Sequence, residues 1–233
     1  MTRLAPCLLL ACLMVGCAET SHAPAVSAEA LRQRAAERRS EGKSAEAENL
    51  LGQAIRAQPT QTRDQRSAAA DLRRELASLR VAGDDLVGAE KLYREALTLL
   101  ETAPRGADAA IINLRTQLAG LCYRQSRFDE AADFYRTVLA LEVTLLGETH
   151  PDPLGTMSIL GGLELKRTKF AEAETLFRRQ LRGVQQVHGA EKRETASVLD
   201  NLADVLEKAG QAAEATRLRG EAARIRRKLC DEC

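Results

Sequence analysis

Hydrophobic positions recur with a helical period of about 3.6 residues from residue 28 to near the end of the chain. A longer repeat is superimposed on it, because one alanine returns at a constant interval of forty-two positions, at Ala47, Ala89, Ala131, Ala173 and Ala215. A second small residue stands twelve positions before each of these, at Ala35, Ala77, Ala119, Gly161 and Ala203. Two antiparallel helices approach closely only where neither projects a bulky side chain. The pattern therefore predicts five helical hairpins.

The large side chains follow the same register. A bulky residue comes one helical turn after the later small residue, at Leu51, Tyr93, Tyr135 and Phe177. A leucine precedes the earlier small residue, at Leu76, Leu118, Leu160 and Leu202. The first unit departs from this pattern with Arg34 and the fifth with Arg219. Departures at both ends are expected of a stack, since a terminal repeat turns one face to water.

The predicted units cover about residues 28–57, 66–103, 107–146, 151–188 and 193–229, each with a short polar turn between its two helices. The link AQPTQTRDQRS at 57–67 is polar, and we expect it to be loosely ordered. Blades of a β-propeller have a similar period but need strands rich in aromatic residues and glycine. Aromatic residues make up only 3% of this chain and tryptophan is absent, which excludes an all-β fold.

Two strings carry a family resemblance. LGETHP, from Leu146 to Pro151, and VLDNLADVLEKAG, from Val198 to Gly210, resemble the inter-repeat loop and the first helix of the 42-residue tetratricopeptide repeat found in kinesin light chains. Helical HEAT-type repeats are the alternative, and the small residues twelve positions apart favour the tetratricopeptide repeat. The resemblance implies an all-α fold, a right-handed α-solenoid of about five helix-turn-helix repeats, over residues 28–229.

The resemblance also implies a concave groove, lined by the first helices, that binds a protein or peptide client. Carried over position by position, the groove residues are Asn113, Thr116, Gln117, Gly120, Tyr123, Arg124, Ser158, Ile159, Gly162, Leu165, Lys166, Asn201, Asp204 and Lys208. Arg124, Lys166 and Lys208 occupy the same position in successive repeats and are expected to form a basic ladder that attracts carboxylates. The family's groove asparagine is present only at Asn201, and the carboxylate-clamp set is missing, so no client class is implied.

The N-terminus resembles an export signal. Arg3 precedes an apolar run from Leu4 to Gly16, which is shorter than the about 20 residues that a membrane-spanning helix needs. The run ends in LMVGC, and a small residue followed by cysteine resembles the lipobox of bacterial lipoproteins. The resemblance implies a signal peptide at 1–16 and lipid on Cys17. LLAC, ending at Cys12, is a competing site, and an ordinary signal peptide without lipid is a further alternative.

Residues 17–27 are small and polar after the cysteine and are expected to form a flexible tether. By the sorting rule of the lipoprotein family, Ala18 in place of aspartate implies an anchor in the outer membrane of a bacterial cell envelope, facing the periplasm. The whole chain has 34 basic and 33 acidic side chains. This balance argues against a dedicated nucleic-acid binder, whose affinity would come from an excess of Lys and Arg.

Candidate chemistry is sparse. Phosphate-binding glycine loops, HExxH helices and GxSxG elbows are missing from the sequence, and none of His22, His150 and His188 has metal-ligand spacing. We therefore expect no enzyme, no cofactor and no metal site. Cys230 and Cys233 form a CxxC at residues 230–233, after the last predicted helix. This pair is a candidate disulfide, half of a metal site or a redox pair.

Between its first and last basic residues the last predicted helix has one acidic residue, Glu221. The basic residues are Arg217, Arg219, Arg224, Arg226, Arg227 and Lys228. Cations near a helix C-terminus oppose its dipole, and a terminal repeat needs a polar face, although contact with anionic lipid or an acidic partner is an alternative. The favoured function is a lipid-anchored scaffold for protein–protein interaction without catalysis. The alternatives are an exported thiol or metal-binding protein that uses the CxxC, and a structural module that self-associates.

Overall fold

The chain is all-α, as its periodicity predicts. The computed structural model describes residues 26–102 and 108–231, and these form ten helices and no strand. Cys12, Cys17, the predicted signal peptide, most of the predicted tether and Cys233 lie outside the described residues. In chain order the helices are α1 (Ala28–Ser40), α2 (Ser44–Ala57), α3 (Arg63–Ala82), α4 (Leu86–Glu101), α5 (Asp108–Arg124), α6 (Phe128–Leu146), α7 (Pro151–Lys166), α8 (Phe170–His188), α9 (Arg193–Lys208) and α10 (Ala212–Asp231).

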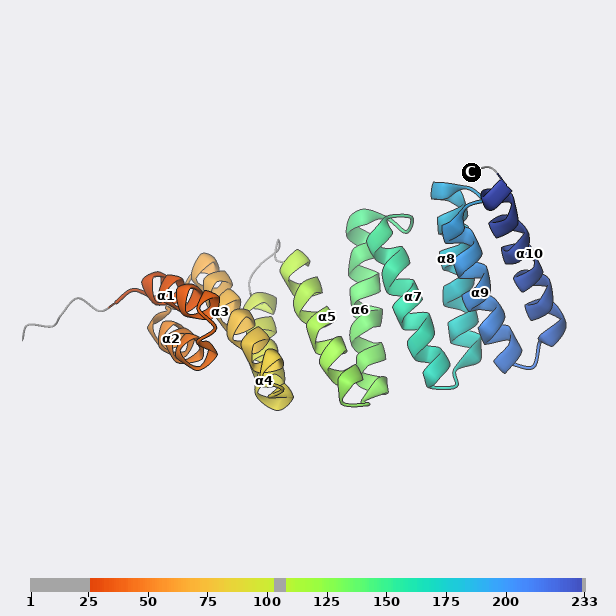
Figure 1. Ribbon diagram of the computed structural model, residues 1–233. Helices are drawn as coiled ribbons and strands as arrows, with labels where there is room; N and C mark the ends of the chain where they lie inside the picture. Colours follow the sequence, from red (N-terminus) through yellow and green to blue (C-terminus); the bar gives the residue numbers. More distant parts are fainter. Residues whose placement is uncertain (1–25, 103–107, 232–233) are drawn as a thin grey trace, which may run out of the picture.

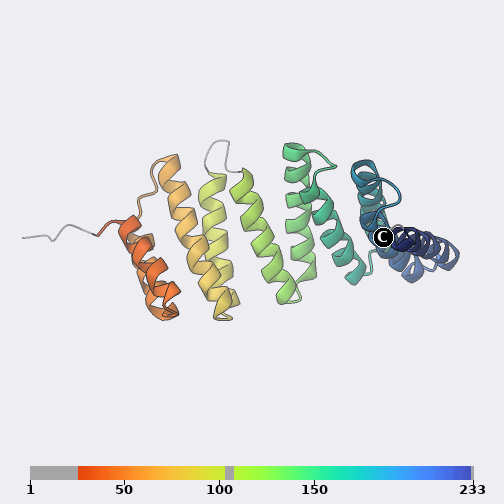
Figure 2. The same cartoon turned by 45° about the horizontal axis from the view of Figure 1, so that its top comes forward.

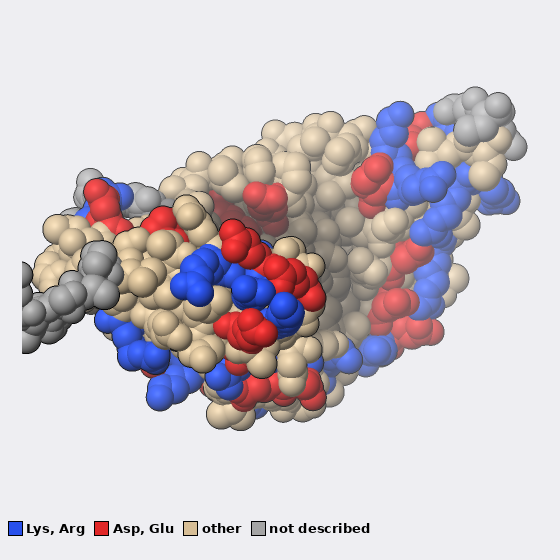
Figure 3. All heavy atoms as spheres, turned by 60° about the vertical axis from the view of Figure 1, so that its left-hand side comes forward, with Lys and Arg blue, Asp and Glu red and all other residues tan. Residues whose placement is uncertain are grey.

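The helices pair into five hairpins that stack in a row (Figure 1 and Figure 2). Within the described residues, the substantial helix–helix contacts all join helices that are consecutive in the chain. Contacts restricted to neighbours are what defines a solenoid, so the predicted helical repeat fold is confirmed. The row encloses a hollow whose surface is mostly uncharged, with Lys, Arg, Asp and Glu gathered at its edges (Figure 3).

The recurring small residues lie where the two helices of each hairpin cross. All ten predicted positions are buried, and the later alanine of each pair is at most 1% exposed. Gly161 shows why bulk is excluded, because a Cβ placed there would lie 2.8 Å from two ring carbons of Phe177. The bulky residue of the second helix therefore fills the space that the small residue of the first helix leaves.

The turn inside each hairpin repeats one backbone geometry. Its central residue has positive φ and recurs once in every repeat, as Gly42, Asp84, Ser126, Thr168 and Gly210. The next residue donates its backbone N–H to the carbonyl five positions earlier, for example Lys169 to Glu164 at 2.9 Å, which is the helix-ending bond of the Schellman motif. A β-branched residue such as Thr168 is unfavourable at positive φ. The backbone hydrogen bond from the following residue stabilises the turn in spite of this local strain.

The link after the first hairpin is shorter and better ordered than its polar sequence suggests. Thr62 accepts a hydrogen bond from the Gln65 N–H at 3.2 Å, and the Gln65 side chain accepts one from the Thr62 N–H at 3.1 Å. This reciprocal capping box satisfies two of the otherwise unpaired N–H groups of a helix start. As a result α3 begins at Arg63, and the prediction of a loose link through residue 67 was wrong.

Glu142 is a buried carboxylate of α6 at a position that other units fill with apolar side chains. It is 6% exposed, and its equivalents in the adjacent repeats are the buried Leu100 and Val184. Its Oε2 has no hydrogen-bond partner among the described residues. Burial raises the pKa of Glu142, and a hydrogen bond from the Thr156 side chain offsets this only in part. Because an ionised, half-satisfied carboxylate is costly to bury, this position lowers the stability of the fold.

We predict that Glu142→Leu raises the free energy of unfolding at neutral pH by about 1 to 3 kcal/mol. Folding raises the pKa of Glu142 above its ordinary value of 4.5. The parent protein therefore has its full stability below pH 4.5, where Glu142 is neutral, and loses part of it as the pH rises through the folded pKa. The advantage of the variant should therefore grow from acid to neutral pH in urea unfolding. Glu37→Leu, at an exposed site of α1, is the control. A variant no more stable than the parent at neutral pH would contradict this interpretation.

Candidate protein-binding surface

The predicted groove residues all lie on the first helices of units three to five, α5, α7 and α9. We call their shared face the first-helix surface. The structure buries none of them. The exposed members include Asn113, Gln117, Tyr123, Arg124, Ile159, Lys166 and Lys208, and the half-buried members include Thr116, Ser158, Leu165 and Asn201. These side chains are therefore available to a ligand, and their role in binding stays a prediction.

Two apolar side chains stand out on this surface. Tyr123 is 43% exposed and Ile159 is 51% exposed. Tyr123 packs edge-to-face against Phe128, with ring centroids 5.5 Å apart, and the Lys166 ammonium lies 5.7 Å from the centroid of the Tyr123 ring. A tyrosine that is already held in place loses little entropy when a partner packs on it. The pair Tyr123 and Lys166 thus joins α5 to α7 as a preorganised aromatic and cationic contact point.

Glycines make part of the surface flat. Gly120 in α5 and Gly162 in α7 occupy equivalent positions in successive repeats, and a Cβ at either would meet no atom within 4 Å. Packing therefore does not require glycine at these positions, although glycine inside a helix costs about 1 kcal/mol relative to alanine. Their effect is to leave helix backbone open to close approach from outside.

The three residues of the expected basic ladder have different surroundings in the structure. Arg124 donates to Asp84 of the preceding unit at 2.8 Å, and Lys166 is directed at the Tyr123 ring. Lys208 lies beside Glu207, whose pKa is lowered first by a hydrogen bond from Arg219 and to a smaller degree by Lys208. The three cations recur in sequence, but they do not form a row of equivalent free charges. Arg124 is the member whose charge is already paired.

Carboxylates of α9 and of the loop before it neutralise most of the basic side chains of the last helix. Arg219 of α10 donates to Asp204 at 2.7 Å and to Glu207 at 2.5 Å. Arg226 pairs with Asp200 of α9. Two further cations converge on Glu191, in the loop before α9, and lower its pKa, Lys228 first and then Arg224. These pairs tie α10 to α9 of the same hairpin and to the loop before it, in agreement with a capping role.

The cysteines offer little for chemistry within the described residues. Cys122 is fully buried, and burial raises the pKa of its thiol, so it is held as an unreactive thiol. Cys230 is exposed and lies in the last turn of α10, which continues to Asp231. The expectation that the CxxC starts after the helix was wrong on this point. Among residues 26–102 and 108–231 no three His, Cys, Asp or Glu side chains cluster as metal ligands would.

None of the described helices combines the length and apolar character needed to cross a membrane.

Sequence reasoning missed a buried charge network between units three and four. Glu164 of α7 is 1% exposed. Its Oε1 accepts from Arg136 of α6, and its Oε2 accepts from Arg167 at 2.6 Å. Arg167 also donates to Asp129 at 2.7 Å. The repeat alignment contained the information needed to find this network. Glu164 stands at the position of Cys122 in unit three and Leu206 in unit five, and both of these are buried.

Comparisons with known proteins agree with this geometry. A sequence profile described as tetratricopeptide repeat matches residues 108–179 and 152–228, and no curated protein matches the chain. A putative kinesin light chain with nearly identical TPR-like repeats from Podosopora anserina aligns with a TM-score of 0.68 at 20% identity, over 86% of this chain and 95% of that chain. BtubC (BKLC) from P. vanneervenii aligns at 0.62 and 22% identity, over 86% and 80%. YrrB, described as a TPR protein with an unusual peptide-binding site, aligns at 0.57 and 14% identity, over 85% and 86%.

Proposed function

Because the chain belongs to the tetratricopeptide repeat family, we propose that it is a non-catalytic scaffold that binds a segment of another protein on its first-helix surface. The client is a protein or peptide held against α5, α7 and α9. The single observation that carries the proposal is the exposed Tyr123, fixed between Phe128 and Lys166. Exposed and rigid aromatic side chains are the usual anchors of protein interfaces.

Further support comes from the backbone exposed at Gly120 and Gly162, which have no packing partner of their own. A client strand or helix is able to approach α5 and α7 closely there. The description of YrrB as carrying a peptide-binding site is in line with a binding role for this fold. We assign no catalytic residue, cofactor or metal to the function.

The proposal places this scaffold in a bacterial envelope. The apolar run Leu4–Gly16 followed by Cys17 supports export and lipid attachment, and the balanced charge of the chain supports a protein client over a nucleic acid. The anchor and the binding surface are independent parts of the proposal, so each has its own test.

To test the binding surface, Ile159 of the full chain is replaced by the photoreactive residue p-benzoylphenylalanine, and the variant is expressed in the native host cell. Irradiation should give a discrete covalent adduct with one partner protein, identified by mass spectrometry. The matched control is the same substitution at Val87, which is 78% exposed on α4 and outside the first-helix surface of units three to five. Equal adducts at both positions, or none at Ile159, would contradict the assignment.

For the anchor, we expect metabolic labelling with a palmitate analogue to mark the protein and Cys17→Ser to abolish the label. The physical reason is that the cysteine thiol is the group that carries the acyl chain in the resembling lipoproteins. Cys12→Ser is the control and should leave the label in place. If label persists in Cys17→Ser and disappears in Cys12→Ser, the anchor lies at Cys12. Persistence in both variants would remove the anchor from the proposal.

A further inference from the structure

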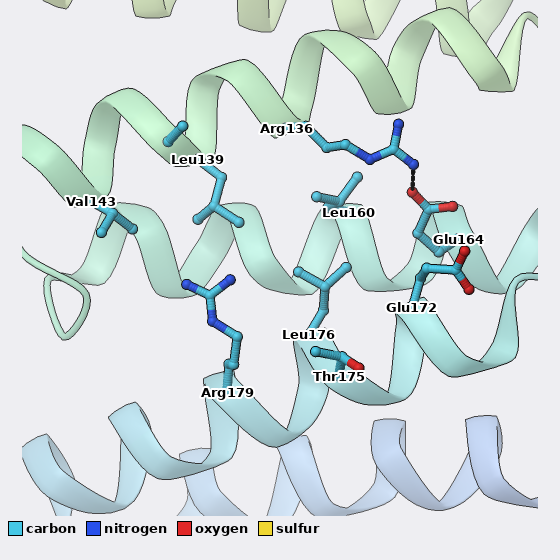
Figure 4. A pocket seen from close by; sticks show the side chains of 10 residues that line it. Arg136, Leu139, Val143, Leu160, Glu164, Glu172, Thr175, Leu176 and Arg179 are labelled. Atoms are coloured by element: carbon cyan, nitrogen blue, oxygen red, sulfur yellow. Dashed lines mark hydrogen bonds and ion pairs between the residues drawn. The ribbon is translucent and has the colours of Figure 1, made fainter.

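A second groove lies on the side of the stack formed by the second helices. It runs between α6 and α8 over α7 and has a volume of about 490 Å³, within the range of about 300 to 1,000 Å³ typical of ligand sites. Its floor is apolar, with Leu139 and Val143 from α6, Leu160 from α7 and Leu176 from α8 directed into one space (Figure 4).

At the equivalent places in the neighbouring units, an ion pair joins the two second helices. Arg94 of α4 pairs with Glu130 of α6 at 3.5 Å, and Arg178 of α8 pairs with Glu214 of α10 at 3.0 Å. The arginine recurs in units two to four and the glutamate in units three to five, so the pair expected between α6 and α8 is Arg136 with Glu172. The repeat therefore predicts a charged bridge over the groove.

That bridge is missing because Arg136 turns inward. It pairs with the buried Glu164 of α7 (Figure 4), a position that is Cys122 or Leu206 in the adjacent units. Glu172 is exposed at the rim of the groove and has no ion-pair or hydrogen-bond partner among the described residues. Diverting one arginine thus leaves Glu172 without its expected counter-ion at the rim of the apolar groove.

The lining of the groove carries two arginines and two glutamates. Arg136 pairs with Glu164 and Arg179 pairs with Glu148, so Glu172 is the charge of this lining that is left for a partner. From Arg136 to Val143 the groove follows α6 for about 10 Å, or two helical turns. A ridge of side chains from a third helix fits a groove between two helices of this kind.

We propose that the groove between α6 and α8 is a second docking surface, which takes an amphipathic helix of a partner protein. The partner inserts an aliphatic ridge onto Leu139, Leu160 and Leu176 and places a Lys or Arg on Glu172. This cation pairs with Glu172 in the way that the repeat pattern expects of Arg136, which pairs with Glu164 instead. The surface is separate from the first-helix surface, so the scaffold is able to hold two proteins at once.

The test uses three labelled synthetic peptides, each a helix of about five turns, titrated by fluorescence anisotropy. The first has leucine at every third or fourth position flanked by lysine, the second has glutamate in place of lysine, and the third has serine in place of leucine. The lysine peptide should bind more tightly than both others to the full chain, and Glu172→Lys should weaken it about tenfold or more. The glutamate peptide should bind better to Glu172→Lys than to the parent.

A second variant tests the availability of Glu172 without replacing Glu172 itself. Glu164→Leu releases Arg136 to bridge to Glu172, as in the neighbouring units, and should also weaken binding of the lysine peptide. Lys166→Glu, on the first-helix surface, should leave this peptide's affinity unchanged. Equal affinity for all three peptides, or affinity insensitive to both Glu172→Lys and Glu164→Leu, overturns the proposal.

Location is checked with p-benzoylphenylalanine at Thr175, which is exposed on the groove rim, and at Arg217, its equivalent on α10. The lysine peptide should crosslink from Thr175 and not from Arg217. Crosslinks from Thr175 to a second copy of this chain, with concentration-dependent dimers, would identify the groove as a self-association surface and overturn the proposal. Failure of the Ile159 adduct, by contrast, bears only on the first-helix surface.

Discussion

Arg167→Met should lower the free energy of unfolding by about 3 to 5 kcal/mol, as expected when one partner of a buried ion pair is removed. Glu164 is 1% exposed, and Arg167, with a side chain 10% exposed, supplies one of its two counter-charges at 2.6 Å. Methionine keeps most of the side-chain volume but donates no hydrogen bond. One carboxylate oxygen of Glu164 is then left in a low-dielectric environment without its donor.

The loss should be recovered when the carboxylate is removed as well. In the double variant Glu164→Leu with Arg167→Met, the site is apolar, as it is at Leu206 in the next unit. Replacing a buried pair by packed apolar side chains is often neutral or stabilising. The matched control is Arg124→Met, which breaks the exposed pair with Asp84 and should change stability by at most about 1 kcal/mol. If urea unfolding gave Arg167→Met and Arg124→Met the same small effect, the network would not stabilise the stack.

Tyr123→Ala should weaken capture of the client that crosslinks from Ile159 by about 30-fold, or about 2 kcal/mol, the size of an interface hot spot. The ring is exposed yet held by Phe128 and Lys166, so it presents apolar area without an ordering cost. Tyr123→Phe keeps the ring and should retain most of the affinity. Circular dichroism should show unchanged helicity in both variants, because Tyr123 is not part of the core.

The charge of this surface has a separate control on the last helix. Lys166→Glu should weaken the same client at least about tenfold, or about 1.4 kcal/mol, whereas Arg227→Glu, exposed on α10, should have much less effect at matched salt. Lys166 is the better probe than Arg124, because Arg124 already pairs with Asp84. If Arg227→Glu had the larger effect, the last helix would be the binding surface and the first-helix assignment would have to be withdrawn.

The sequence by itself determined the fold of this protein. Small residues twelve positions apart, repeated at a constant interval, predicted hairpins, and the structure buries every one of those small residues. This was possible because a helix is encoded by contacts three and four residues apart, and a solenoid packs only neighbours in the chain. The turn residues and the bulky positions follow from the same short-range register.

The family resemblance also indicated which face of α5, α7 and α9 is open, because the structure buries none of the positions carried over from the family. It did not predict how much of Arg124 is already neutralised by Asp84, which belongs to the preceding unit. A long cationic side chain reaches several carboxylates, and the sequence spacing does not rank them.

Only the tertiary structure decided the direction of Arg136. The repeat pairs it with Glu172, as Arg94 pairs with Glu130, but the buried Glu164 takes it instead. The reason is physical: leaving Oε1 of the buried Glu164 without a donor costs more than leaving an exposed carboxylate in water. That choice depends on which position α7 turns into the core. It distinguishes the groove between α6 and α8, of about 490 Å³, from the equivalent groove between α4 and α6, which keeps the pair of Arg94 with Glu130 and has about 380 Å³.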